Sequence, residues 1–472
     1  MSFPNSMNLI KLDVMKVVSK KSVLAGHIVV PGSKSHTIRG LILAAMADGV
    51  SHISNPLNSE DCLSTVEALE SLGVHITRDE NMWTVEGAGK NLKLPESSFS
   101  VNVGNSGSLM YFLSPVLATL SGEVIFTGDD SIRKRPVDHL LDAFNQLGVR
   151  AESLGKNNRP PFSFFGPIKF SAENDYTKKI VTDGALSQYI SGFMMAATRC
   201  GGTIDIELKD PKETPYLTMT KLWLESLGVN VKMSHDFKHI SVGGPVTIEG
   251  FDKTIPSDWE GVAFPLIAAL ISGSEITIDN VDSSGSQGDD KIVDILKSVG
   301  ANIVWDKVRN TLWVKGNKIL TTKGLPRKTL RVNISDFPDA ICALSVIACF
   351  IEGKTVITDV EICRKKETDR VKAMVENLSL LGADIREDGD SLVINGHCPF
   401  NEDGTQNTKC KLHGGKVEVY KDHRIAMALA CFGLGLRNSE AVVIRDGECC
   451  NVSFPGFFER MNKLGAGFGL SE

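Results

Sequence analysis

A short phrase recurs six times along the chain, at intervals of 72 to 83 residues, and this repeat constrains the fold more than any other feature. In each copy an amphipathic helical pattern, such as STVEALESLG, ends in a hydrophobic residue followed by glycine. Glycine at this place fits a left-handed helix C-cap, after which a strand begins. The six glycines are Gly73, Gly148, Gly228, Gly300, Gly382 and Gly465.

A second phrase recurs in the same frame and consists of an alanine-rich apolar helix, a glycine and a β-branched strand. Two of its six copies are LILAAMADGVSHISN and FPLIAALISGSEITIDNV. Ordinary alternation of helix and strand is the competing explanation, but six matches to both phrases disfavour it. We therefore predict an α/β protein of six βαβαββ-type units that account for nearly the whole chain.

The composition narrows the class of protein. A chain of 472 residues is too long for one ordinary core, so two domains or a repeat array is expected. No apolar segment reaches the ~18 residues of a membrane span, and MSFPNSMNLIKLDVMKVVSKK lacks the apolar core of a signal peptide. A cytoplasmic protein without a membrane partner is expected. The ten cysteines form no C-x-x-C pair, which predicts reduced, mostly buried thiols and no metal site.

Basic residues gather in four short clusters, although the formal net charge is −6 and gives no overall attraction for nucleic acid. Predicted helix starts follow these clusters, and free N–H groups there favour anions. If the clusters converge in space, they make an anion site. A solvated helix edge is the competing interpretation for any one of them, including RKKETDR at 364–370. The clusters are Lys34 with Arg39, Arg133 to Arg135, Arg364 to Arg370, and Lys421 with Arg424.

Eight stretches in this order and spacing resemble the 5-enolpyruvylshikimate-3-phosphate synthase family across almost all of the chain. They are PGSKSHTIRG (31–40), GNSGS (104–108), RKRP (133–136), LSQYISGFMMAA (186–197), PYLTMT (215–220), FPDA (337–340), KKETDR (365–370) and DHRIAMA (422–428). UDP-N-acetylglucosamine enolpyruvyl transferases share the family's fold and use a mobile-loop cysteine. The equivalent loop here, GDDSIRKRP, has none, and PGSKS favours the shikimate branch.

The resemblance implies two domains built as inside-out α/β barrels of three repeats each, with the active site in the cleft between them. Residues 1–30 and 256–472 would form one domain, and residues 31–255 an inserted one. It also implies a monomer that needs no metal or organic cofactor. Its partners would be small anions, namely phosphoenolpyruvate and shikimate 3-phosphate.

Family members transfer the enolpyruvyl group of phosphoenolpyruvate to the 5-hydroxyl of shikimate 3-phosphate and release phosphate. This chemistry needs a base for the hydroxyl, an acid for the methylene carbon and cations for the anionic groups. By resemblance, the catalytic residues are Lys34, Asp339, Glu367 and Lys366. Glu367 lies among cations that lower a carboxyl pKa, so it would act as an acid only after closure desolvates it.

The resemblance also assigns binding residues. Those that match contacts to the shikimate part are Ser35, Arg39, Ser187, Gln188, Tyr216, Asp339 and Lys366. Those that match contacts to phosphoenolpyruvate are Lys34, Gly107, Gln188, Arg370 and Arg424. Core packing is an equal alternative for Tyr216, and His423 serves either to orient Arg424 or as neutral packing. The turn at Gly104 and Asn105 brings backbone N–H groups toward a ligand or is only a loop.

The departures from the family fall on phosphate contacts. Ser131 and Val452 stand where the family has an Arg and a Lys for the phosphoenolpyruvate phosphate, and Tyr111 replaces another Arg. Leu186 and Glu213 occupy places of serines that hold the 3-phosphate. A carboxylate near a phosphate dianion is repulsive, by about 1 kcal/mol at ~4 Å even in water.

Three hypotheses follow from these departures. In the first, neighbouring cations replace the missing ones and ordinary synthase activity persists; the candidates are Arg133, Lys134, Arg364 and Lys365. In the second, the chain is a paralogue that acts on an unphosphorylated shikimate-like hydroxy acid or catalyses elimination without phosphoenolpyruvate. In the third, it is a non-catalytic anion-binding protein, which retention of both Asp339 and Glu367 disfavours.

Overall fold

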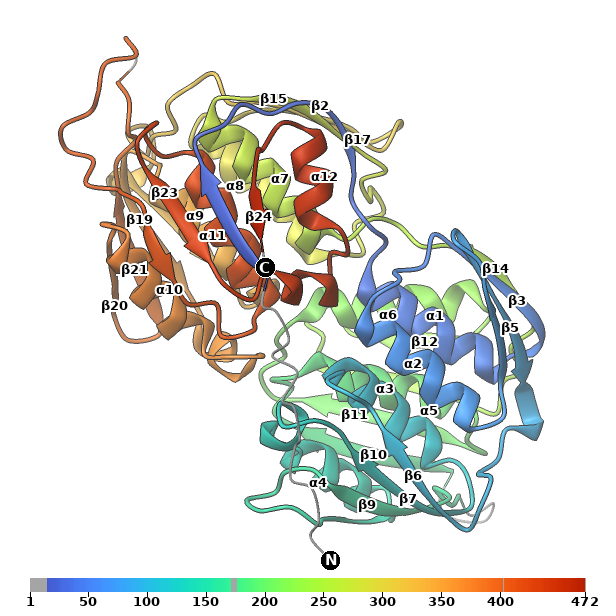
Figure 1. Cartoon of the computed structure of the whole chain (residues 1–472). Helices are drawn as coiled ribbons and strands as arrows, with labels where there is room; N and C mark the ends of the chain where they lie inside the picture. Colours follow the sequence, from blue (N-terminus) through green and yellow to red (C-terminus); the bar gives the residue numbers. More distant parts are fainter. Residues whose placement is uncertain (1–14, 171–175, 402, 472) are drawn as a thin grey trace, which may run out of the picture.

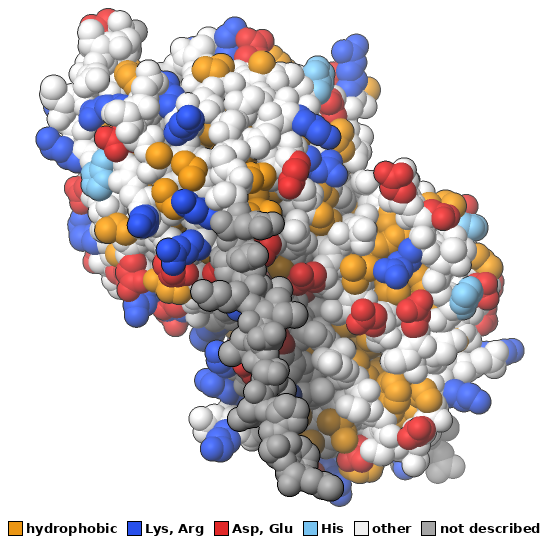
Figure 2. Space-filling model, viewed as in Figure 1, with side chains coloured by type: hydrophobic (Ala, Val, Ile, Leu, Met, Phe, Trp, Pro, Cys, Tyr) orange, Lys and Arg blue, Asp and Glu red, His pale blue; other side chains and the backbone are white. Residues whose placement is uncertain are grey.

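The computed structural model describes residues 15–170, 176–401 and 403–471, so residues 1–14 of the predicted first domain lie outside the described residues. The described chain forms two lobes that meet along one side (Figure 1). Across these three ranges, no helix is both long and apolar enough to cross a membrane. Basic and acidic side chains are scattered over both lobes on the face shown in Figure 2.

One lobe contains three four-stranded sheets and the helices between their strands. The first sheet has strands β3 (Asp48–Ser54), β4 (His75–Arg78), β5 (Met82–Ala88) and β14 (Asp252–Thr254), with helices α1 (Lys34–Met46) and α2 (Glu60–Ser71). The second has β6 (Ser98–Asn102), β7 (Gly122–Thr127), β8 (Arg150–Ser153) and β9 (Phe162–Gly166), with α3 (Gly107–Leu117) and α4 (Asp138–Gln146). The third has β10 (Thr177–Thr182), β11 (Thr203–Leu208), β12 (Val231–Met233) and β13 (His239–Gly243), with α5 (Ser187–Ala197) and α6 (Thr214–Ser226).

The other lobe contains three further four-stranded sheets. The first has β2 (Ala25–Val29), β15 (Glu275–Asp279), β16 (Asn302–Asp306) and β17 (Thr311–Lys315), with α7 (Trp259–Ser272) and α8 (Ile292–Ser298). The second has β18 (Thr329–Asn333), β19 (Gly353–Thr358), β20 (Asp384–Glu387) and β21 (Ser391–Gly396), with α9 (Ile341–Ala348) and α10 (Arg370–Leu380). The third has β1 (Lys16–Lys20), β22 (Gly415–Val417), β23 (Ala441–Ile444) and β24 (Gly469–Ser471), with α11 (His423–Leu434) and α12 (Phe457–Lys463).

Each sheet has one parallel strand pair and two antiparallel pairs. In β6-β7-β9-β8, for example, β6 pairs with β7 in parallel, and β9 pairs antiparallel with both β7 and β8. In this sheet the buried apolar helix α3 connects the parallel pair, and the amphipathic helix α4 leads to the antiparallel hairpin. The amphipathic helices α2, α4, α6, α8, α10 and α12 are followed by the six predicted glycines, all of which have positive φ. The predicted left-handed helix ends are therefore confirmed.

Two strands are exchanged between the lobes. β2 directly precedes α1 in sequence but pairs with β15, and β14 directly precedes α7 but pairs with β3. The two connecting segments run beside each other: Ser33 N donates to Pro256 O at 2.7 Å, and Asp258 N donates to Pro31 O at 3.0 Å. Gly32 lies between them, where a Cβ atom would meet Asn55 O at 2.3 Å, so this close approach requires glycine.

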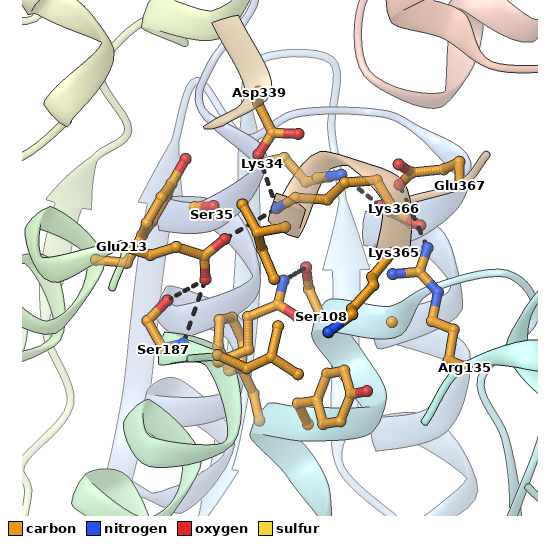
Figure 3. Close-up of a pocket in the computed structure, with 18 of the residues that line it drawn as sticks. Lys34, Ser35, Ser108, Arg135, Ser187, Glu213, Asp339, Lys365, Lys366 and Glu367 are labelled. Atoms are coloured by element: carbon orange, nitrogen blue, oxygen red, sulfur yellow. Dashed lines mark hydrogen bonds and ion pairs between the residues drawn. The ribbon is translucent and has the colours of Figure 1, made fainter. Parts of the chain in front are cut away.

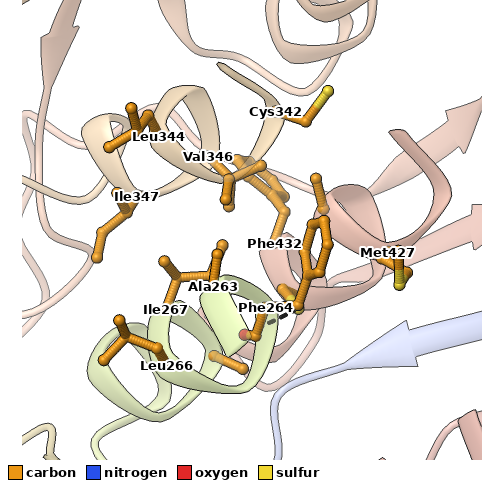
Figure 4. Close-up of a cluster of buried hydrophobic side chains, with 14 of the residues drawn as sticks. Ala263, Phe264, Leu266, Ile267, Cys342, Leu344, Val346, Ile347, Met427 and Phe432 are labelled. Atoms are coloured by element: carbon orange, nitrogen blue, oxygen red, sulfur yellow. Dashed lines mark hydrogen bonds between the residues drawn. The ribbon is translucent and has the colours of Figure 1, made fainter. Parts of the chain in front are cut away.

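The buried side chains form two separate hydrophobic clusters. One cluster runs from Ile38 to Ile255, and the other joins residues before 31 to residues after 258. In the second cluster, α7, α9 and α11 pack together through apolar side chains such as Phe264, Val346 and Phe432 (Figure 4). Burying these aromatic and branched side chains removes apolar surface from water and fixes where the polar starts of the three helices lie.

Candidate active site

A narrow cavity, partly open to solvent, lies where the two lobes meet. Its lining includes residues at the starts of all six buried helices, or of the short turns that lead into them. From the lobe of α1, α3 and α5 come Lys34, Gly107 and Ser187; from the lobe of α7, α9 and α11 come Glu260, Asp339 and Arg424. The positive ends of these helix dipoles therefore point at one place, which favours anions.

Lys34 is the first residue of α1 and pairs with Asp61 of α2, with 2.9 Å between Nζ and Oδ2. Burial lowers the pKa of Lys34, but the charges of Asp61 and Glu367 outweigh burial and raise it above its usual value. The ammonium group is therefore permanently charged at neutral pH. Ser35 lines the cavity beside it (Figure 3).

Lys366 links the two lobes through two carboxylates. It follows the 3-10 turn Glu361–Lys365, and its Nζ lies 3.2 Å from Asp339 Oδ2 of its own lobe. The same Nζ lies 2.9 Å from Glu213 Oε1 of the other lobe (Figure 3). Burial lowers the pKa of Lys366, but Asp339 and Glu213 raise it more, so the net shift is upward.

Arg370 is fully buried and holds three carboxylates at once. Its Nε lies 2.8 Å from Asp422 Oδ2, Nη1 contacts Asp339 Oδ1, and Nη2 lies 2.6 Å from Glu367 Oε2. Asp422 also caps α11 by accepting from Arg424 N at 2.9 Å. Arg370 does not line the cavity itself, so in this conformation it orients the reactive carboxylates.

Glu367 faces the cavity between two arginines. Besides Arg370, Arg135 of the other lobe donates from Nη2 to Glu367 Oε1 at 3.3 Å. Burial alone raises the pKa of Glu367, but the charges of Arg370 and Arg135 overcome it and hold the pKa well below its usual value. Asp339 has a lowered pKa for the same kind of reason, since Lys366 and Arg370 outweigh its burial. Both groups are ionised and therefore able to accept protons.

Arg424 reaches the cavity from α11 and contacts Glu260 Oε2 through Nη2. Its Nε lies 3.4 Å from Asp339 Oδ1 but has no hydrogen-bond partner among the described residues. Glu260 also accepts from Tyr216 Oη at 2.5 Å, which joins α6 of one lobe to α7 of the other. His423 is buried and its pKa is lowered by burial, so it is neutral beside this group.

Arg39 lies under the cavity on the inner face of α1. Its Nε donates to Thr220 Oγ1 at 2.8 Å, Nη1 donates to Ser35 O at 3.0 Å, and Nη2 donates to Ser191 Oγ at 3.2 Å. The guanidinium also stacks over the Phe112 ring at 4.4 Å. Burial lowers the pKa of Arg39 to about 9, which leaves it charged at neutral pH.

The start of α5 carries an anion that belongs to the protein. Glu213 Oε2 accepts from Ser187 Oγ at 2.9 Å and from Ser187 N at 3.2 Å. Gln188, the next residue, donates to Ser108 Oγ of α3 at 3.1 Å. Leu186, where a phosphate-binding serine was expected by resemblance, contributes an apolar side chain to the lining.

The basic clusters converge only in part. Lys365 lines the cavity, but Arg133, Lys134 and Lys421 are exposed and none of the three lines it. Arg364 also lies outside, because it pairs with Glu387 at 2.6 Å and with Glu361 and Asp369. Of the candidate replacement cations, Lys365 alone is thus placed at the cavity. Ser131 and Val452 do not line it either.

Several lining residues were missed in the sequence. Arg135 was not singled out from its two basic neighbours, and only the turn at Ile132–Lys134 determines that it points inward. Asp61 and Glu260 gave no signal, because their partners Lys34 and Arg424 belong to distant segments. Tyr111, which the sequence analysis identified in place of an Arg, is buried, donates from Oη to Pro136 O at 2.7 Å, and has a pKa raised by burial to about 12.

The lining combines six basic with five acidic side chains, so its formal charge is +1. Such a site binds anions, holds carboxylates ionised as bases, and supplies N–H donors to developing negative charge. Among the described residues, no group of three or more His, Cys, Asp and Glu side chains is placed to hold a metal ion.

Comparison with known proteins gives one family. The sequence profile described as EPSP synthase (3-phosphoshikimate 1-carboxyvinyltransferase) matches residues 18–461. A 3-phosphoshikimate 1-carboxyvinyltransferase of Acetivibrio thermocellus is 36% identical over 453 residues, which is 96% of this chain and 99% of the relative. One of Methanococcus maripaludis is 33% identical over 458 residues, again 96% of this chain and 99% of the relative.

Solved structures agree with the sequence comparisons. An EPSP synthase from Acinetobacter baumannii superposes with a TM-score of 0.79 at 27% identity, covering 97% of this chain and 100% of that one. The mixed α/β fold is therefore that of EPSP synthase structures. On the matched profile, the full-length relatives and the shared fold, the chain belongs to the EPSP synthase (3-phosphoshikimate 1-carboxyvinyltransferase) family.

Proposed function

We propose that the protein transfers the carboxyvinyl group of phosphoenolpyruvate to the 5-hydroxyl of shikimate 3-phosphate and releases phosphate, as a transferase of the shikimate pathway. The observation that carries this proposal is the group of Asp339, Lys366 and Glu367 facing Lys34 and Arg135 across the junction of the lobes. A site that only bound anions would gain nothing from two ionised carboxylates at its centre, since each repels the ligand.

The reaction moves one proton from the acceptor hydroxyl to the phosphate that leaves, and another onto and off the methylene carbon. The site offers one carboxyl group for each of these two protons. The acceptor hydroxyl oxygen attacks C2 of phosphoenolpyruvate while Asp339 takes the hydroxyl proton. The methylene carbon gains a proton from Glu367 and becomes a methyl group, giving a tetrahedral intermediate that still carries phosphate. Glu367 then removes a methyl proton, the C–O bond to phosphate breaks, and the hydroxyl proton held by Asp339 leaves with the phosphate.

The cations have different roles in this scheme. Arg424 offers its unpartnered Nε to the phosphoenolpyruvate carboxylate, and Arg370 positions Asp339 and Glu367 from behind. Glu367 needs a proton in the first step, although its pKa is lowered in the free protein. A substrate carboxylate that draws donors away from Glu367 and excludes water raises its pKa, so substrate binding prepares the acid.

The variant Glu367→Gln tests the proposal. It keeps the size of the side chain and removes the proton transfer, so turnover should fall by ~100-fold or more. Glu361→Gln is the matched control, because Glu361 is an exposed glutamate of the preceding turn and lies outside the cavity. Phosphate release from phosphoenolpyruvate and formation of the carboxyvinyl ether are measured together. Unchanged turnover of Glu367→Gln would remove Glu367 from the mechanism, and no ether from the wild-type protein would exclude the transferase.

The finer description of the fold belongs to the same proposal. We propose two domains, residues 1–30 with 256–472 and residues 31–255, each an inside-out α/β barrel of three units. The two separate hydrophobic clusters and the adjacent connecting segments support this division. A single-chain state, a cytoplasmic location and the lack of a nucleic-acid partner stay predictions.

A further inference from the structure

Glu260 joins the two lobes through its two carboxylate oxygens. Its Oε1 accepts from Tyr216 Oη of α6 at 2.5 Å, and its Oε2 contacts Arg424 Nη2 of α11. Tyr216 belongs to one lobe, whereas Glu260 and Arg424 belong to the other. The side chain of Glu260 is only 10% exposed, so water competes little for either contact. A phenol of one lobe and a guanidinium of the other therefore depend on the same carboxylate.

The backbone at Glu260 is held firmly by its own lobe. Glu260 is the second residue of α7, and its backbone N–H donates to Oδ1 of the N-cap residue Asp258 at 3.0 Å. The residue between them, Trp259, is fully buried, and its Nε1 donates to Asp282 O at 2.7 Å. A negative side chain in the first turn of a helix is also favoured by the helix dipole. What reaches Glu260 from the other lobe is the hydroxyl of Tyr216.

Arg424 has a second carboxylate within reach. Its Nε lies 3.4 Å from Asp339 Oδ1, where the charges attract although no hydrogen bond is formed. A guanidinium that turned onto Asp339 would lose the free Nε that we assign to the phosphoenolpyruvate carboxylate. It would also block the group that takes the hydroxyl proton. Because Glu260 holds the Nη2 end of the guanidinium, Nε stays available to the ligand.

Tyr216 also contacts the residue that the resemblance assigns to the acceptor's carboxylate. Arg39 Nη2 donates to Tyr216 O at 3.3 Å. Hydrogen bonds and an ion pair therefore run without a gap from Arg39 to Arg424, across the junction of the lobes. Core packing alone would not require the Tyr216 hydroxyl, whereas this path does.

We propose that Glu260 is a positioning residue that sets Arg424 for the phosphoenolpyruvate carboxylate, and that the Tyr216 hydroxyl keeps Glu260 in place from the acceptor's lobe. The proposal rests on the carboxyvinyl transfer proposed above and adds a pair of residues that couples its two substrate sites. A residue on the acceptor side thereby controls the affinity for phosphoenolpyruvate.

A double-mutant cycle of Glu260→Gln, Tyr216→Phe and the double variant tests the proposal through the KM values for phosphoenolpyruvate and shikimate 3-phosphate. Each single change removes a hydrogen bond or ion pair of a charged group, so the KM for phosphoenolpyruvate should rise by roughly 10-fold and kcat should change far less. The double variant should show the same rise of roughly 10-fold, because both changes break one path. Independent effects that multiply to about 100-fold would contradict the coupling.

The direction of each effect is equally decisive. A lower KM for phosphoenolpyruvate in Glu260→Gln would show that Glu260 competes with the ligand for Arg424, and the positioning role would be wrong. If Tyr216→Phe raised the KM for shikimate 3-phosphate alone, its hydroxyl would serve the acceptor and not Glu260.

Tyr189→Phe is the matched control. Tyr189 lies in α5 of the same lobe as Tyr216, is buried, and shares a hydrogen bond of 2.6 Å between its Oη and Thr182 Oγ1. It does not line the cavity, so its loss of a hydroxyl should leave the KM for phosphoenolpyruvate unchanged. Thermal unfolding shows whether each variant is folded. An equal rise in Tyr189→Phe would assign the effect to general loosening of the lobe and overturn the proposal.

Calorimetric titration with phosphoenolpyruvate alone separates this inference from the proposed function. If the wild-type protein forms no ether, the transferase is excluded, and the dissociation constants of the wild type and the three variants still show whether Glu260 and Tyr216 act as one unit. If the ether forms but the variants bind phosphoenolpyruvate as the wild type does, the coupling is wrong and the transferase stands.

Discussion

Two helix starts in one lobe face the cavity, and the protein treats them differently. At the start of α5, Glu213 supplies a carboxylate to Ser187 and Lys366. At the start of α3, Ser106 caps the helix by accepting from Leu109 N at 3.2 Å, and Gly107 leaves room for the Arg135 guanidinium. The first end is already neutralised by the protein. The second end keeps its positive potential for an outside anion, and we assign it to the phosphate of phosphoenolpyruvate.

The largest effect is expected from removing the cation at the α3 end. Arg135→Gln takes away a half-buried guanidinium that contacts Glu367, so the KM for phosphoenolpyruvate should rise by ~100-fold. The affinity for the acceptor should change far less, because Arg135 lies away from Glu213. Arg133→Gln, at an exposed neighbour, is the control and should leave the KM for both substrates unchanged in the same steady-state assay. An equal rise in KM for both substrates in Arg135→Gln would contradict the distinction between the two helix starts.

A smaller change at the same end is Gly107→Ala. The added Cβ would lie 2.7 Å from Arg135 Nη1, so the guanidinium must move while the backbone stays. The KM for phosphoenolpyruvate should rise by roughly 10-fold, with little change in melting temperature, because the displaced atoms are the far end of a flexible side chain. A large loss of stability instead would show that Gly107 is needed for packing.

Lys365 and Arg364 are adjacent cations with different surroundings, and they sharpen the comparison further. Lys365 lines the cavity, so Lys365→Ala should weaken phosphoenolpyruvate binding by roughly 5-fold. Arg364→Ala should leave binding unchanged, because its charge is used by Glu361, Asp369 and Glu387 outside the cavity. Measuring both at low and high salt provides a check, since only the Lys365 effect should weaken with added salt. An equal loss in Arg364→Ala would contradict the assignment.

The smallest effect concerns stability and comes from a buried histidine of α1 that does not line the cavity. His36 Nδ1 accepts from Trp223 Nε1 of α6 at 2.9 Å, and burial lowers the pKa of His36 to about 4. The folded protein thus binds this proton less readily than the unfolded chain, so the contribution is complete above pH 6.5 and is lost as the pH falls toward 4. At pH 6 the loss should be about 1 kcal/mol. In His36→Gln, the free energy of unfolding measured with denaturant should lose this part of its pH dependence. An unchanged pH dependence in the variant would contradict the assignment.

Much of the fold could be predicted because it rests on local patterns. Each of the six predicted glycines lies just after an amphipathic helix and has positive φ. These helix ends could be predicted because the helical pattern and its glycine are neighbours in the sequence. The exchange of β2 and β14 between lobes could not be derived from such patterns, since each strand pairs with a segment about 200 or more residues away.

The candidate site was foreseen less completely, for a physical reason. Its residue types could be read from motifs, but the ion pairs that set their charge states join distant segments, such as Lys34 with Asp61 and Arg135 with Glu367. Glu213 was recognised as a charge that conflicts with a phosphate. That it caps α5 and binds Lys366 depends on the tertiary arrangement of three segments.

The pattern of inhibition by inorganic phosphate tests the difference between the two ends most directly. In the carboxyvinyl transfer assay with shikimate 3-phosphate as acceptor, inorganic phosphate should compete with phosphoenolpyruvate at the α3 end and should not compete with the acceptor, because Glu213 already neutralises the start of α5. Arg135→Gln should weaken this inhibition, and Glu213→Ser should create competition with the acceptor. Phosphate that competes with the acceptor in the wild-type protein would contradict the account.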